Sequence, residues 1–280
     1  MTPRSRLPLL IAPAVLFLVA VYLWPSLGLF RFAFNEVGPT GATIETWSLQ
    51  TARGVFADSF TAELTLNSLW LASSSTAIAL LLAYPVSLFL YRTQSRFRGL
   101  LAVIAIMPML ISSVVRVFGW LAILGDQGLV NSIARTLGLI TTPMHLVFNW
   151  TGVTIGLAES IMPYMILALL AGFGQLDRTL EEASRSLGAS PLRTFLRVTL
   201  PLSLPALALA AGLGFILSMS AYVTPKLLGG GRVFVLATEI FEQATTNANW
   251  PVASVLALYT LALLLVLLTV FNLAARSLQR

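Results

Sequence analysis

The 280-residue chain contains no cysteine and a single histidine, His145. Disulfide frameworks, thiolate catalysis, iron–sulfur clusters and zinc sites built from Cys and His are therefore excluded. Charged residues make up only 10% of the chain, against roughly 25% in an ordinary soluble domain, whereas 57% of the residues are apolar and the mean hydropathy is +0.87. A water-soluble globular fold is excluded, and the composition predicts an all-α membrane protein.

Lysine also occurs only once, at Lys226, and leucine follows it. A phosphate-binding loop, GxxxxGK[ST], needs a lysine that reaches the phosphates, so this chain cannot form one. His145 lies in a predicted loop, where a solvated histidine is the simpler interpretation, and no carboxylate pair indicates a hydrolase or a metal site. We therefore expect no catalytic residues, no metal and no cofactor in this chain.

Long runs without charge predict the membrane spans, because crossing a bilayer takes about 20 apolar residues of helix. Two of the six runs carry one charge each, Arg116 and Glu159, and the last two runs include some loop. The expected spans are 7–30, 64–91, 99–125, 151–174, 198–225 and 243–275. The sequence thus predicts six transmembrane helices in a single transmembrane domain, residues 1–280.

The distribution of basic residues predicts the orientation of these spans. The two termini, the loop 92–98 and the segment 177–197 together hold eleven of the seventeen cations and three of the eleven acids. Loops rich in Arg and Lys stay on the cytoplasmic side, so we expect both termini in the cytoplasm. The first apolar run is longer than the 7–15 residues of a signal peptide and lacks a small-residue cleavage site, so we expect it to remain as a helix.

The outer loop 126–150 predicts a short interfacial helix, because Leu129, Ile133 and Leu137 recur at helical spacing. In another outer loop, three consecutive glycines at 229–231 predict a bend.

The cytoplasmic segment 176–205 is too long for a simple connector, since antiparallel helices are usually joined by about 2–8 residues. Its first part carries an apolar stripe typical of an amphipathic helix, formed by Leu176, Leu180, Ala183 and Leu187. We expect a structured, rigid element here, and the alternative is a solvated loop.

Capping residues indicate where the helices of this segment begin and end. Asp177 or Thr179 can cap the start of the first helix, and Gly188 can end it in the left-handed conformation. Ser190 can then cap a second helix with Pro191 in its first turn. The prediction is a helix, a sharp turn and a second helix.

The same segment resembles a known signature. Glu182-Ala183-Ser184, followed by Gly188 and by Val198-Thr199-Leu200-Pro201, resembles the EAA motif of permease subunits in binding-protein-dependent ABC importers. Serine replaces the third residue of the motif and valine replaces its usual isoleucine. The chain is most similar to the spermidine/putrescine class of these permeases, and the stretches that carry this similarity are Leu66–Trp70, Ala83–Pro85, Leu187–Pro191, Tyr222–Gly231 and Asn249–Pro251.

The resemblance implies a type I ABC importer permease fold in a bacterial inner membrane, with a cytoplasmic coupling helix that docks into a cleft of an ATPase subunit. It also implies a second homologous permease subunit, two ATP-binding cassette subunits that bind ATP and Mg, and an extracytoplasmic solute-binding protein, with no role for nucleic acid. Glu182, Ala183 and Gly188 would form the core of the ATPase contact. The full set of expected coupling residues is Glu181, Glu182, Ala183, Ser184, Leu187, Gly188, Ala189, Ser190 and Pro191.

The two charges within the spans point to a second candidate site. A charge at the centre of a membrane helix costs about 2.5–3.5 kcal/mol on insertion scales, so Arg116 and Glu159 each need a partner or water. Both lie at a similar depth and can face each other, either as a structural ion pair or on the translocation path, unless the span boundaries are misplaced. The candidate path residues are Arg116, Glu159, Tyr164, Ser218, Ser220, Tyr222 and Thr224.

The resemblance favours a polyamine-type solute, but Ser220 stands where polyamine permeases often have an acid. Another amine, an amino acid derivative or an organophosphonate therefore stays open. The alternative functions are a channel or secondary transporter that works alone, with Glu159 as an ion site, and a membrane enzyme, for which no catalytic cluster is found.

Overall fold

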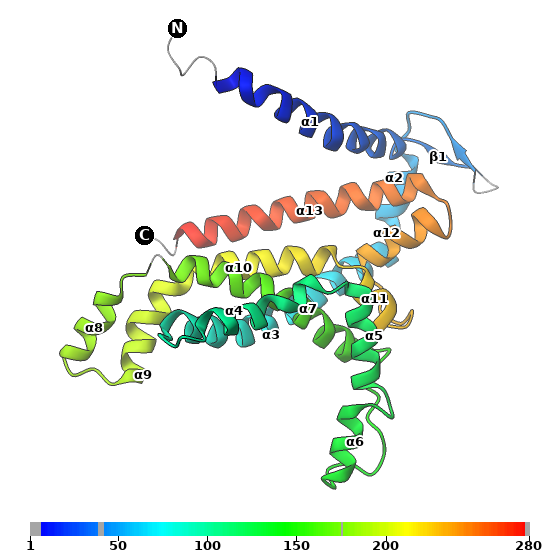
Figure 1. The fold of residues 1–280 in the computed structure, drawn as a ribbon. Helices are drawn as coiled ribbons and strands as arrows, with labels where there is room; N and C mark the ends of the chain where they lie inside the picture. Colours follow the sequence, from blue (N-terminus) through cyan, green and yellow to red (C-terminus); the bar gives the residue numbers. More distant parts are fainter. Residues whose placement is uncertain (1–6, 39–41, 175, 278–280) are drawn as a thin grey trace. The chain divides into compact units, whose positions relative to one another are not determined.

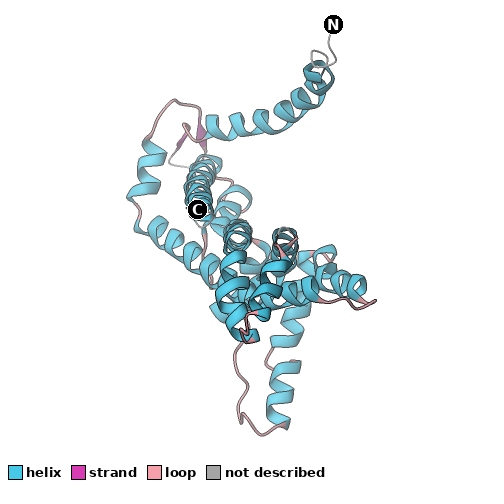
Figure 2. Cartoon of the chain, turned by 90° about the vertical axis from the view of Figure 1, so that its left-hand side faces the viewer, coloured by secondary structure: helices cyan, strands magenta, loops and turns pink. Residues whose placement is uncertain are grey.

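A computed structural model describes residues 7–38, 42–174 and 176–277, and the side chains of all of these except 7–11, 178 and 274–277. Arg4, Arg6 and Arg280, three of the cations expected in the cytoplasm, lie outside the described residues. Within them the chain is almost entirely helical, and its only strands are the paired β1 (Glu36–Val37) and β2 (Thr43–Ile44) (Figure 2). The predicted all-α class is confirmed.

Six stretches of the described chain are helical, long and apolar enough to cross a membrane, in agreement with the predicted number. They are Ala12–Phe32, Ser59–Arg92, Ser113–Thr136, Trp150–Phe173, Pro191–Ser220 and Trp250–Leu273. Five of these stretches are formed wholly or mainly by one long helix: α1 (Leu7–Phe32), α3 (Ser59–Arg92), α7 (Trp150–Phe173), α10 (Leu200–Ser220) and α13 (Trp250–Ser277).

The third span differs from the prediction. Instead of one helix over 99–125, the chain forms α4 (Arg98–Ile106), a 3₁₀ turn (Met107–Leu110) and, after a break, α5 (Ser113–Leu124). Ile111 and Ser112 are extended, with ψ of 136° each. Pro108 cannot donate a backbone hydrogen bond, which weakens a helix at this point. The prediction of one continuous helix over 99–125 was wrong, and the candidate span begins only at Ser113.

The short helix expected in the following loop is confirmed as α6 (Leu129–Thr136). Leu129 and Ile133 of its apolar stripe are exposed, but α6 lies within the candidate span Ser113–Thr136, so its interfacial position stays a prediction. On its other face the buried Asn131 donates to the carbonyl oxygens of Gly125 and Met144, at 3.0 and 2.9 Å.

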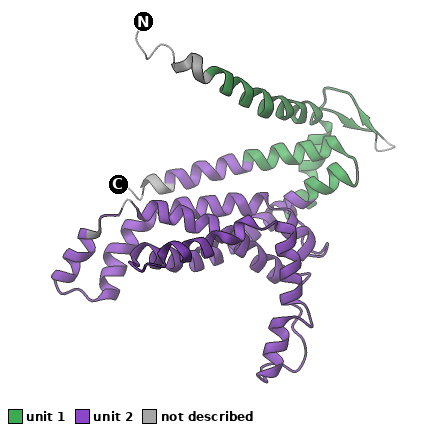
Figure 3. Ribbon diagram, viewed as in Figure 1, with its two compact units in different colours: residues 1–63, 239–262 green, residues 64–238, 263–280 purple. Residues whose placement is uncertain are grey.

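The chain divides into two compact units, residues 1–63 with 239–262 and residues 64–238 with 263–280 (Figure 3). The first unit contains α1, the two strands and α2 (Gln50–Ala57), together with most of α12 (Leu236–Thr245) and the first part of α13. At the end of α1, Arg31 donates to the carbonyl oxygen of Thr46 at 3.0 Å and lies 4.5 Å from the centre of the Trp47 ring. These contacts fix the C-terminal end of α1 to the loop that follows it.

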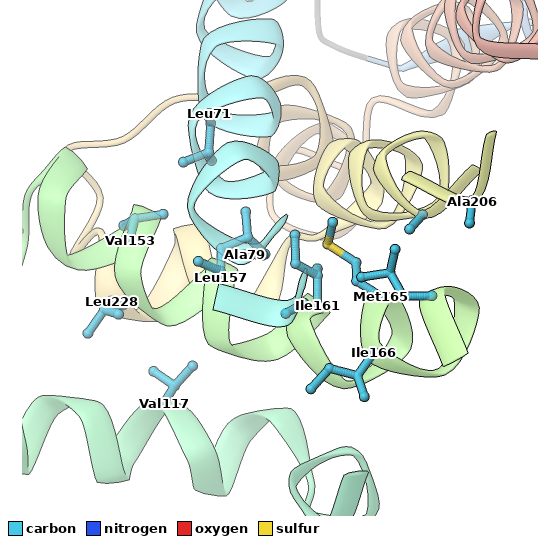
Figure 4. Packing of buried hydrophobic residues seen from close by; sticks show 14 of the residues in the cluster. Leu71, Ala79, Val117, Val153, Leu157, Ile161, Met165, Ile166, Ala206 and Leu228 are labelled. Carbon is cyan, nitrogen blue, oxygen red and sulfur yellow. The ribbon is translucent and has the colours of Figure 1, made fainter. Parts of the chain in front are cut away.

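The second unit is built around α7. Its closest packing is with α10, and it also contacts α4, α5 and α11 (Val223–Leu228) (Figure 1). The α7 side chains Val153, Leu157, Ile161, Met165 and Ile166 are almost completely buried and form the centre of the core (Figure 4).

Small residues allow α7 and α10 to approach each other closely. A Cβ atom added at Gly172 of α7 would lie 2.3 Å from the Cβ of Ala206, and one added at Gly214 of α10 would lie 2.7 Å from the sulfur of Met165. Membrane helices associate through such close packing, because lipid removes the hydrophobic driving force between them.

The bend expected at residues 229–231, after α11, is confirmed. Gly230 and Gly231 have φ of 57° and 73°, values that favour glycine.

We expect Gly172→Ala to destabilise the second unit by about 1–3 kcal/mol, since an added methyl group overpacks the α7–α10 contact. Gly119→Ala in α5 is the matched control, because a Cβ there meets nothing within 4 Å and the gain in helix propensity is the same. Thermal unfolding of the purified protein in detergent measures the difference. Equal stability of the two variants would show that the contact is not tight.

Candidate functional site

The predicted helix, turn and helix are present in the second unit as α8 (Arg178–Ser186), a four-residue turn and α9 (Pro191–Thr194), which we call the α8–α9 hairpin, residues 177–194 (Figure 1). Of the two proposed caps, Asp177 is the one used: its carboxylate accepts from the backbone N–H of Thr179 at 2.9 Å. Hydrogen bonds from the Thr179 side chain and backbone lower the pKa of Asp177 below its ordinary value. Ser190 caps α9 by accepting from the N–H of Arg193, with Pro191 in the first turn.

The corner of the hairpin is made by Gly188, whose φ is 81°. The N–H of Gly188 donates to the carbonyl of Arg185 at 2.9 Å, and that of Ala189 donates to Ser184 at 3.1 Å. This pair of bonds is a Schellman motif, which ends a helix and requires the left-handed conformation at the glycine. The local signals in the sequence therefore predicted the shape of the hairpin correctly.

The predicted apolar stripe is divided in the structure. Leu176 lies before α8 and packs against the core, and Leu180, which is 46% exposed, lines with it a cavity beside α7 and α10. Ser184 is turned toward α9, where its hydroxyl lies 3.1 Å from that of the buried Thr194. The rest of the stripe is exposed, and Leu187 at the corner is 89% exposed. We call the exposed residues Ala183, Leu187 and Leu192 the exposed apolar face of the hairpin, and exposed apolar patches mark sites of protein association.

Glu181 also points inward and joins the hairpin to two other helices. Its carboxylate forms an ion pair with Arg92, the last residue of α3, at 2.8 Å, and accepts a hydrogen bond from Thr199 at 2.7 Å. Thr199 in turn accepts from Arg92 at 3.1 Å. Burial alone would raise the pKa of Glu181, but the hydrogen bonds from Thr199 and Arg92 outweigh it, and the pKa is lowered.

Thr199 is the last residue of a π-helical turn, Phe195–Thr199, that connects α9 to α10. Wider turns of this kind often occur at functional sites. Neither this turn nor the partners of Glu181 was expected from the sequence, because Arg92 and Thr199 lie 89 and 18 residues away from it.

The structure therefore separates the nine expected coupling residues into two groups. Glu181 and Ser184 contact the rest of this chain, whereas Glu182, Ala183, Leu187, Gly188, Ser190 and Pro191 are exposed and Ala189 is half-buried. Only the second group is placed for contact with another subunit.

In the membrane region, Arg116 of α5 and Glu159 of α7 face each other, with 3.6 Å between Nη1 and Oε1. Their side chains are 13% and 25% exposed. The other carboxylate oxygen of Glu159 accepts from the indole N–H of Trp120 at 3.3 Å. Within the described residues, Nε and Nη1 of Arg116 are buried and have no hydrogen-bond partner, and leaving a buried donor unsatisfied costs about 1–3 kcal/mol.

Arg116 lines a cavity of about 230 Å³ between α5, α7, the end of α10 and α11. Of the seven candidate path residues, five line it: Arg116, Tyr164, Ser220, Tyr222 and Thr224. Ser218 does not, because it is buried on another face of α10 and its hydroxyl lies 3.1 Å from that of Ser75 in α3. Sequence reasoning missed Ser113 and Ser160, which also line the cavity and gave no signal beyond being serines in a span.

Residues 61–280 match the family model described as "Binding-protein-dependent transport system inner membrane component". The chain belongs to this family. It is 30% identical over 219 residues to the spermidine/putrescine transport system permease protein PotB of Haemophilus influenzae, a match that covers 78% of this chain and 77% of the relative. The PotB protein of Escherichia coli K12 is 31% identical over 218 residues, covering 78% and 79%.

Solved structures share the fold. A permease chain in the crystal structure of a bacterial ABC transporter that imports the acidic polysaccharide alginate has a TM-score of 0.77 at 18% identity, covering 97% of this chain and 95% of that chain. A second structure of the alginate transporter, in complex with a periplasmic protein bound to an alginate pentasaccharide, gives 0.71, again at 18% identity, covering 97% and 94%. The protein is thus the permease of a binding-protein-dependent ABC importer, a multi-pass inner membrane protein that is not itself an enzyme.

We expect Glu181→Gln to weaken the attachment of the hairpin to α3 and α10. Charge-assisted hydrogen bonds contribute about 1.5–3 kcal/mol, and partial exposure of Arg92 reduces this to about 1 kcal/mol, so the amides of α8 and α9 should exchange with solvent about fivefold faster. Hydrogen–deuterium exchange measures this, with the exposed neighbour Glu182→Gln as the control.

Folding lowers the pKa of Glu181, so its carboxylate stabilises the attached hairpin only while it is ionised. This stabilisation is fully present above the ordinary pKa range of a carboxyl group and is lost as the pH falls through the lowered pKa. Exchange that is equally fast in both variants would contradict the inward role of Glu181.

Proposed function

We propose that this chain is one of two homologous permease subunits in an importer that also contains two ATP-binding cassette subunits and an extracytoplasmic solute-binding protein. ATP and Mg bind in the cassette subunits. The family description supports the binding protein, and the alginate transporter, which has the same fold, is an ABC transporter solved with its periplasmic protein. Both termini and the α8–α9 hairpin then lie on the cytoplasmic side, as the distribution of arginine indicates.

The exposed apolar face of the α8–α9 hairpin is the observation that supports this proposal most directly. A leucine that is 89% exposed at the corner of a rigidly capped hairpin is costly in water and gains stability when another protein covers it. Glu182 and Gly188 lie beside it on the exposed side, where a basic residue of an ATPase can pair with the carboxylate and its backbone can approach the glycine.

The inward contacts of the hairpin explain how motion would reach the membrane. When the cassette subunits close on ATP, they move the hairpin, and Glu181 passes that movement to the end of α3 and to the start of α10 through Arg92 and Thr199. Alternating access of the solute path then follows from shifts of these helices.

For the solute we propose a small amine-bearing compound, with polyamines as the first candidates because the PotB relatives are named for spermidine and putrescine. Another amine, an amino acid derivative or an organophosphonate is the alternative.

Co-purification after mild detergent extraction tests the docking proposal. We expect Leu187→Asp and Gly188→Arg to reduce recovery of the ATPase at least about tenfold, because the first places a charge in an apolar contact and the second adds bulk at the corner. Gly188→Ala keeps the surface small and tests backbone strain alone.

Leu129→Asp is the matched control, since Leu129 is also strongly exposed but lies on α6 in the outer loop. A stand-alone secondary transporter would purify without an ATPase and would tolerate all four changes. That result would refute the proposed function.

A further inference from the structure

The cavity beside Arg116 offers charge of only one sign. Among the described residues that line it, Arg116 is the only charged one, and no carboxylate contributes to the wall. The remaining polar groups are hydroxyls, carried by Ser113, Ser160, Tyr164, Ser220, Tyr222 and Thr224. The guanidinium of Arg116 has donors only, whereas the hydroxyls can donate or accept, and that of Ser220 already donates to the carbonyl oxygen of Ile216. Arg116 is therefore the group of this wall that selects an acceptor.

Glu159 does not use up the donors of Arg116. Its Oε1 atom lies 3.6 Å from Nη1, which is beyond hydrogen-bond distance, and its Oε2 atom is already bonded to Trp120. The buried Nε and Nη1 of Arg116 therefore lack an acceptor within the described chain. Glu159 balances the charge of the guanidinium and leaves its hydrogen-bonding capacity available.

A carboxylate or phosphonate is the group that fits these donors. A guanidinium binds two oxygens of such an anion through two parallel N–H bonds, and the arrangement is strong where water is excluded. An ammonium group has donors and no acceptor, and beside Arg116 it would meet a charge of its own sign. Ser220, on the same wall, is neutral and offers an ammonium no counter-charge.

We propose that this cavity binds an anionic oxygen group of the transported solute against Arg116. The inference rests on the proposed function but reverses the order of its solute candidates, because Arg116 favours amino acid derivatives and organophosphonates over polyamines. A volume of about 230 Å³ has room for a small anionic head group and a short chain.

The test uses the detergent-purified transporter with its partner subunits and compares four probes. Putrescine and 4-aminobutanoate both have four carbons and an amine at one end. At the other end putrescine has a second ammonium group, whereas 4-aminobutanoate has a carboxylate. 3-Aminopropylphosphonate replaces the carboxylate by a phosphonate, and spermidine is a longer polyamine. The readout is the rise in Tm on addition of each probe, since a ligand that binds the folded protein stabilises it.

We expect 4-aminobutanoate or 3-aminopropylphosphonate to raise Tm by a few degrees, and putrescine and spermidine to leave it unchanged. Whichever anion gives the larger shift identifies the group. Arg116→Gln should weaken that binding at least about tenfold, Arg116→Lys should retain part of it, and Glu159→Gln should retain it because the guanidinium remains.

Recovery of the ATPase with each variant shows that the variant has folded and assembled. It also separates failure of the proposed importer function from failure of the inference about the solute. Loss of the ATPase from the wild-type preparation would refute the proposed function. Three results would overturn the inference about the solute. They are a rise in Tm with the polyamines, no rise with either anionic probe, and a rise that persists in an assembled Arg116→Gln transporter.

Discussion

The close contact between α7 and α10 is the constraint on which the rest of the second unit depends. It exists because Gly172 leaves room for Ala206 and Gly214 leaves room for Met165. With the two helices held together, the α7 side chains Ser160 and Tyr164 meet the end of α10 at the cavity, while the start of α10 emerges beside the α8–α9 hairpin. One helix pair therefore positions both candidate sites.

The hairpin and the cavity lie at opposite ends of the same helix. Thr199 precedes α10 and bonds to Glu181, and Ser220 ends α10 and lines the cavity. The 21 residues between these points rise about 1.5 Å each, a length of roughly 31 Å, which is close to the thickness of a bilayer core. If the hairpin moves as proposed, one continuous helix therefore connects it to the cavity with no loop between them.

The sequence predicted those features that depend on neighbouring residues. The long runs with little or no charge indicated six helical spans, and the turn at Gly188 and the cap at Ser190 followed from local chemistry. The orientation of α8 could not be predicted, because the inward turn of Glu181 depends on Arg92, 89 residues away. The break at Ile111 was missed for a related reason: a proline in a span can kink a helix or end it, and the outcome depends on what packs beside it. Arg116 and Glu159 were expected at a similar depth, but only the fold shows that the carboxylate leaves two guanidinium donors unmatched.

The wide turn at Phe195–Thr199 absorbs one residue between the hairpin and α10. A π-turn accommodates one residue more than an α-turn, so five residues here carry the chain about as far around the helix axis as four α-helical residues do. Removing a single residue here would let regular α geometry close the gap and leave Leu187 pointing nearly as it does now. Removing two residues would instead rotate the hairpin by about 100° and change the direction from which a neighbouring protein must approach.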